Sequence, residues 1–139
     1  MSALLFVFAL STDASAHGGG PDHASPASSE APTTIPATFA EVVAALRTRQ
    51  TDASMAVSQG RLGDVHALSR AISDLAAAAA AKVAEVSGAE GAAVALQALE
   101  IRTAADALHQ AADAGDPGAA TAAVDRMTRP LLVLSAQGG

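Results

Sequence analysis

Four histidines are the residues of this chain with the most evident chemistry: His17, His23, His66 and His109. A neutral imidazole is the commonest side-chain ligand for transition metals in proteins. The chain has no cysteine, which excludes thiolate zinc sites, a cysteine nucleophile, disulfides and covalently attached c-type haem. The histidines therefore point to a metal site built from nitrogen ligands.

The first two histidines lie in the Gly-rich stretch HGGGPDH, residues 17–23. If a leader is cleaved after Ala16, His17 becomes the first residue of the mature chain. Its α-amine and imidazole can then close a chelate on one metal ion, with His23 and Asp22 within reach through flexible glycines. Nitrogen-rich sites of this kind favour Cu(II) first, then Ni(II) or Zn(II). The alternative is that these histidines belong to a solvated linker and bind no metal.

The other two histidines fall on segments with helical periodicity, each at the edge of an apolar stripe. In an antiparallel hairpin that turns at residues 87–88, His66 and His109 lie equally far from the turn, so we expect them at the same depth. Asp106 and Asp113 flank His109 at i−3 and i+4, and we expect both to point outward. Because zinc normally takes at least three protein ligands, the alternative is a pair of ordinary boundary histidines.

The composition narrows the classes of function. The net charge of −6 argues against nucleic acid, which requires a basic surface, and no basic cluster favours an anionic membrane. Phe39 is the one aromatic residue after the leader, so bases and sugars have no stacking platform. We find no Gly-rich phosphate loop, HExxH motif or nucleophile elbow. We therefore expect a protein that is not an enzyme.

The N-terminal region predicts export. Residues 1–16 contain the apolar run ALLFVFAL followed by ASA, which is typical of a secretory signal peptide with a small-residue cleavage site after Ala16. No Lys or Arg precedes the run, so we expect the start codon to lie upstream. Residues 17–36 are rich in Gly, Pro, Ser and Thr and are expected to form a disordered linker. We expect the mature protein to be periplasmic, with no membrane span.

Residues 37–136 are expected to form an all-α domain. Apolar residues recur at helical spacing in four segments: about 37–59, 62–86, 89–114 and 117–136. Gly60 and Gly115 end the first and third segments, and Pro130 must kink or break the fourth. Thr34 is the expected N-cap of the first helix, and Ile35 is expected on its apolar stripe.

An internal repeat predicts how these helices pack. The shift that places Gly60 on Gly115 also aligns residues 46–48 (LRT) with 101–103 (IRT), and Gly63 with Gly118. The sequence thus predicts two similar helical hairpins, which bury their stripes as an antiparallel up-down-up-down four-helix bundle. Leu96 and Leu99 fall on a second face of the third helix, which we expect to be contacted from two sides.

Three short motifs carry a resemblance to small exported bundle proteins associated with heavy-metal efflux: residues 34–38 (TIPAT), 60–66 (GRLGDVH) and 71–75 (AISDL). The likeness covers most of residues 34–135 and implies a periplasmic helical bundle. Those proteins tend to carry several histidines in a row at the start of the second helix. This chain keeps only His66 there, followed by Ala67 and Leu68.

Residues 109–116 (HQAADAGD) and the alanine-rich segment after them resemble the last two helices of soluble periplasmic cytochrome b-type bundles, over about residues 95–135. That family holds haem between a Met on its first helix and a His on its last. Here the last segment has no His, and Met55 lies at the wrong end and on the wrong face of the first. The resemblance therefore implies the bundle and no haem.

Together these patterns predict a periplasmic accessory protein of metal homeostasis, without catalysis. It is expected to bind Cu(II), or Zn(II) or Ni(II), weakly through His17 and His23, with His66 and His109 as further ligands. Its expected partners are metal-efflux components. The alternative is a metal-free helical module that pairs with itself or with another exported protein.

Overall fold

The structure is a computed structural model that describes residues 32–85 and 88–137, which form helices and no strands. The α-helices are α1 (Phe39–Ser58), α2 (Leu62–Ala81), α3 (Gly88–Asp113), α4 (Pro117–Arg126) and α5 (Thr128–Gln137), and a 3₁₀-helix, η1 (Lys82–Glu85), follows α2. The predicted all-α fold is confirmed. The predicted signal peptide and most of the predicted linker lie outside the described residues.

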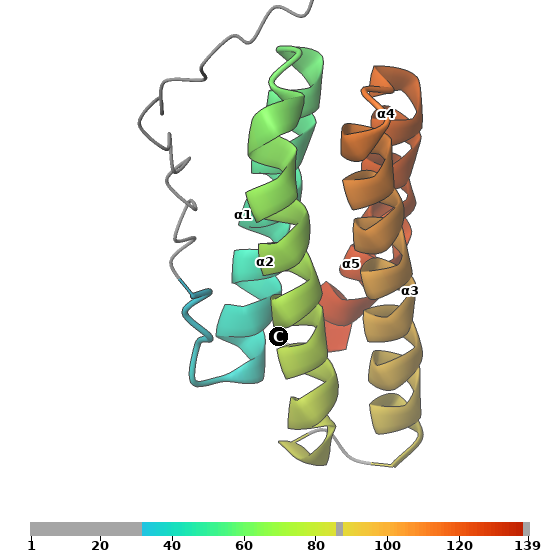
Figure 1. Cartoon of the computed structure of the whole chain (residues 1–139). Helices are drawn as coiled ribbons and strands as arrows, with labels where there is room; N and C mark the ends of the chain where they lie inside the picture. Colours follow the sequence, from blue (N-terminus) through green and yellow to red (C-terminus); the bar gives the residue numbers. More distant parts are fainter. Residues whose placement is uncertain (1–31, 86–87, 138–139) are drawn as a thin grey trace, which may run out of the picture.

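Helices α1, α2 and α3 each form one rod, and α4 and α5, separated only by Met127, together form a fourth. The rods lie side by side (Figure 1). The turn between α1 and α2 and the turn between α3 and α4 lie at one end of the bundle, and α3 begins at the other (Figure 1). Helix α2 packs against α1 and α3, while α4 and α5 pack against α3 and α1. The four rods therefore enclose one core.

The core contains large aliphatic residues separated by alanines. Its largest fully buried side chains come from α1, α2, α3 and α5 and from the residue that separates α4 from α5: Leu46, Ile72, Leu75, Ile101, Leu108, Met127 and Leu134. Small alanine side chains let helix backbones approach closely but bury little apolar surface each. Among the described residues, the predicted stripes lie in the core or pack against it, except that Ile35 is exposed because it precedes α1. Val86, predicted at the end of the second stripe, lies outside the described residues.

The outer face of α3 has no partner among the described residues. Leu96 is 61% exposed and Leu99 is 58% exposed. The expectation that this helix is contacted from two sides is not met within the part of the chain that the structure describes.

The first helix begins later than predicted. Thr38, and not Thr34, is its N-cap: the Glu41 amide donates to the Thr38 hydroxyl (3.3 Å), and the Thr38 amide donates to the Glu41 carboxylate (3.0 Å). Hydrogen bonds from the Thr38 backbone and then its side chain lower the pKa of Glu41 below its ordinary value. The sequence signal was present, because Thr followed three residues later by Glu is a capping box.

The break predicted at Pro130 is confirmed, and it separates α4 from α5 at Met127. A proline ring clashes with the carbonyl four residues earlier and supplies no amide hydrogen, so the helix cannot continue through Arg126. On α1, Gln50 donates to the Val124 carbonyl (3.3 Å) and to the Thr128 hydroxyl (3.0 Å). These bonds satisfy polar groups at the break and attach it to α1.

The two turns at one end of the bundle have the same hydrogen bonds. In each turn a glycine with positive φ, 69° at Gly60 and 65° at Gly115, donates three residues back, and the next amide donates five residues back. The bonds are Gly60 to Val57 (3.0 Å), Arg61 to Ala56 (2.8 Å), Gly115 to Ala112 (3.1 Å) and Asp116 to Ala111 (2.9 Å).

We expect Gly115→Ala to destabilise the protein by about 1 kcal/mol, because an L-residue is strained at positive φ. Gly63→Ala is the matched control and is expected to stabilise by about 0.4–1 kcal/mol, since Gly63 lies in α2 without a positive φ. A Cβ at either glycine meets no atom within 4 Å, so the two variants differ only in backbone conformation. Urea denaturation measures both; two variants of equal stability would contradict the prediction.

Candidate metal centre

Two neighbouring helices bring three potential metal ligands together near the end of the bundle that carries the two glycine turns. His66 lies in the first turns of α2, while His109 and Asp113 lie in the last turns of α3. His109 and Asp113 are four residues apart and therefore share one face of α3. The predicted common depth of His66 and His109 is confirmed, because their rings are in contact across the α2–α3 interface.

The three side chains are close enough to share one ion. The Nδ1 atoms of His66 and His109 are 3.4 Å apart, and the rings meet edge to face with centroids 4.9 Å apart. Asp113 lies 3.7 Å from His66 Nδ1 through Oδ1 and 3.6 Å from His109 Nε2 through Oδ2. One ligand atom from each residue lies within 4.8 Å of the other two.

These separations suit a small transition-metal ion. Zinc–nitrogen bonds of about 2.0–2.1 Å in tetrahedral geometry place two ligand atoms roughly 3.4 Å apart. The Asp113 carboxylate lies at nearly this distance from His66 Nδ1 and from His109 Nε2. The imidazole side chains are 36% and 43% exposed, so water or a further ligand has access to the ion. The group can therefore hold a metal with an open coordination position.

Ser69 contacts the His109 ring and the backbone of His66. It is 3% exposed, and its hydroxyl donates to the His66 carbonyl (2.9 Å). That bond uses its single proton, so its oxygen is left as an acceptor for His109 Nδ1–H at 3.3 Å. In this tautomer His109 Nε2 carries the lone pair and faces Asp113. A partner on the second nitrogen is the usual arrangement for a metal-binding histidine.

The sequence predicted only part of this group. It indicated both histidines and the outward direction of Asp113, whose side chain is 61% exposed. It did not indicate that the Asp113 carboxylate approaches both rings, nor that Ser69 contacts His109. The signal for Ser69 was its place one turn after His66 on the same face of α2. Asp106 is exposed and lies outside the group, and Met55 is an exposed side chain on α1. His17 and His23 lie outside the described residues.

A comparison of the chain with protein families, with curated proteins and with solved structures finds no match. Among the described residues, no helix is both long enough and apolar enough to cross a membrane. The arrangement of His66, His109 and Asp113 is therefore the observation from which function has to be argued.

Proposed function

We propose that the protein is an exported, non-catalytic accessory protein of metal homeostasis that binds one divalent transition metal at His66, His109 and Asp113. The observation that supports this proposal is the convergence of three ligand atoms from α2 and α3 within 4.8 Å. The leader-like sequence of residues 1–16 supports export. The expected partners are components of a metal-efflux system.

Copper is the first choice of metal. Two imidazoles and one carboxylate provide nitrogen and oxygen ligands of intermediate softness. Among divalent first-row ions, the affinity for such ligands is highest for Cu(II), followed by Ni(II) or Zn(II). The ligands are partly exposed, so water competes for the ion. We therefore propose weak, exchangeable binding, which suits a protein that passes its metal on.

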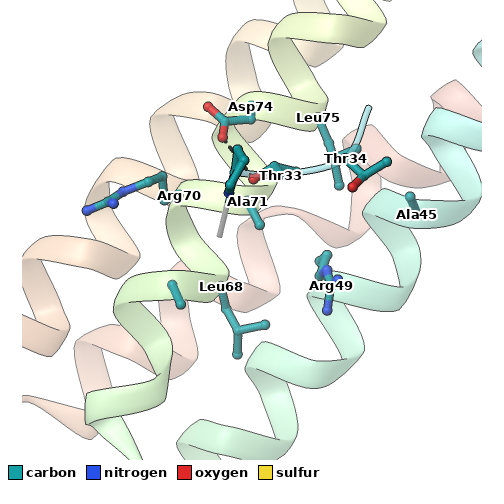
Figure 2. A pocket seen from close by; sticks show the side chains of 11 residues that line it. Thr33, Thr34, Ala45, Arg49, Leu68, Arg70, Ala71, Asp74 and Leu75 are labelled. Carbon is teal, nitrogen blue, oxygen red and sulfur yellow. Dashed lines mark hydrogen bonds between the residues drawn. The ribbon is translucent and has the colours of Figure 1, made fainter. Parts of the chain in front are cut away.

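The N-terminal histidines are proposed to add ligands. Thr33 Oγ1 donates to Asp74 Oδ2 (2.9 Å), which attaches the start of the described chain to α2 (Figure 2). The ten Cα–Cα steps from His23 to Thr33 can span at most about 33–36 Å, whereas Asp74 and His66 are about 12 Å apart along the helix. His23 can therefore reach the centre as a fourth ligand, and His17 can bind Cu(II) together with its own α-amine.

We also propose the finer architecture, an antiparallel up-down-up-down bundle of two similar hairpins. The matched hydrogen bonds of the Gly60 and Gly115 turns support it. The shift in sequence position that places Gly60 on Gly115 also shows what the other hairpin carries at the positions of the metal ligands. His109, Asp113 and His66 correspond there to Ser54, Ser58 and Thr121, none of which is a strong metal ligand. The two hairpins together would therefore carry one such centre.

We expect the mature chain, beginning at His17, to bind Cu(II) about tenfold more tightly than its His17→Ala variant, because the variant loses the imidazole that closes the chelate with the α-amine. Isothermal titration calorimetry of both proteins measures the difference. Equal affinities would rule out a role for His17 and would leave the helical centre to be tested separately.

A second candidate function is a metal-free interaction module, favoured by the exposed Leu96 and Leu99 on the outer face of α3. This function predicts concentration-dependent association that is unchanged by EDTA, measured by sedimentation equilibrium. A metal-binding function instead predicts saturable Cu(II) binding that depends on the histidines.

A further inference from the structure

A hollow of about 520 Å³ lies between α1, α2 and the segment that precedes α1. Figure 2 shows Ala45 and Arg49 on α1, Leu68 and Leu75 on α2, and Thr34 on the segment that crosses between them. None of its lining residues belongs to the His66 group. Its volume is within the range of small-molecule sites, about 300–1,000 Å³.

The hollow exists because small side chains face each other across it. Alanines line both helices, Ala45 on α1 and Ala71 on α2, and an alanine fills little of the space between two helix surfaces. The third wall is held in place by the hydrogen bond from Thr33 to Asp74. Leu68 and Leu75 add apolar surface, so one part of the hollow suits a hydrocarbon group.

The polar lining favours an anion. Arg49 lines the hollow on α1, and Asp74 lines it on α2, where its carboxylate already accepts the Thr33 hydroxyl. Arg49 Nη1 lies 3.3 Å from Asp52, but a guanidinium has five N–H donors in a planar fork, which suits bidentate binding of a carboxylate.

We propose that this hollow binds a small amphipathic organic anion. Its carboxylate contacts Arg49, and its hydrocarbon part lies against Leu68 and Leu75 between the alanines. A second polar end could reach the hydroxyls of Thr33 and Thr34, which line the hollow as well. The inference rests on this hollow alone and holds with or without metal at the histidines.

The test uses the full mature chain with EDTA present and sodium octanoate as the probe. Amide shifts of Ala45 and Ala71 are followed by NMR, and we expect saturation with a Kd on the order of 1 mM, as an open site allows. The uncharged analogue 1-octanol is expected to bind at least about fivefold more weakly, because it cannot pair with Arg49.

Three variants separate charge from shape. Arg49→Gln is expected to weaken octanoate binding at least about fivefold, whereas Asp52→Asn, which breaks the same ion pair and keeps the cation, retains it. Ala71→Leu fills the hollow and is expected to abolish binding. The absence of saturable shifts at Ala45 and Ala71 would overturn the proposal. So would equal affinity for octanol, or wild-type affinity in Arg49→Gln.

Discussion

Replacing His109 with alanine is expected to lower the affinity of the helical centre for Cu(II) by about 100-fold, or about 2.7 kcal/mol. His109 is the residue of the group that faces both partners, His66 through Nδ1 and Asp113 through Nε2. Its removal leaves two partly exposed ligands, which is fewer than protein metal sites normally use. Competition with a chromophoric chelator measures the change, in a His17→Ala background that weakens the N-terminal chelate.

Gln110→Ala is the matched control for this prediction, because Gln110 is the exposed next residue of α3 and lies outside the group. It should bind Cu(II) as tightly as the parent protein. Circular dichroism should show both variants equally helical, since His109 is only partly buried. If His109→Ala kept the parent affinity, the centre would have to be abandoned, whatever the result for His17.

Ser69 distinguishes the two ways in which His109 can bind the metal. If Nε2 is the ligand, the hydroxyl of Ser69 orients the ring through Nδ1, as the 3.3 Å contact indicates. Partners of this kind typically contribute about 10- to 100-fold in metal affinity. If Nδ1 were the ligand instead, Ser69 would compete with the metal for the same nitrogen. The observed bond from Ser69 to the His66 carbonyl favours the first arrangement.

The sequence was sufficient to predict the helices and their ends at the glycine turns, because a glycine at positive φ ends a helix through its own backbone conformation. The break at Pro130 was also predictable, because proline disrupts the helix locally. The prediction failed at the start of α1, where Thr34 and Thr38 both precede a helical segment. The residue three positions later distinguishes them, because Glu41 completes a capping box with Thr38 whereas Ala37 follows Thr34.

Helix geometry alone predicts only part of the metal centre, namely the depth of the two histidines in the bundle. Equal distance from the turn at residues 87–88 placed His66 and His109 at one depth, which needs no knowledge of packing. How closely the Asp113 carboxylate approaches the two rings depends on the rotation of α3 about its own axis, which the whole core determines. For that reason the two histidines could be predicted as ligands from the sequence, whereas the approach of Asp113 to both is seen only in the structure.

The second large effect is expected from Leu108→Ala, which should destabilise the protein by about 2–5 kcal/mol. Leu108 is fully buried in the core beside His109, and alanine-rich neighbours have few atoms that can move in to fill the cavity. A typical domain is stable by only about 5–15 kcal/mol, so the variant loses a large part of its stability. Leu99→Ala, on the exposed face of the same helix, is the control and is expected to change stability by less than about 0.5 kcal/mol.

The destabilised variant also provides a second measure of metal binding. A ligand that binds only the folded state at 100 times its Kd stabilises that state by about 2.7 kcal/mol. Urea midpoints of Leu108→Ala should therefore rise when Cu(II) is added. Those of the double variant Leu108→Ala/His109→Ala should rise much less, with both proteins carrying His17→Ala. An equal rise in the two proteins would mean that the copper binds elsewhere. A Leu108→Ala protein as stable as Leu99→Ala would contradict the core described for α3.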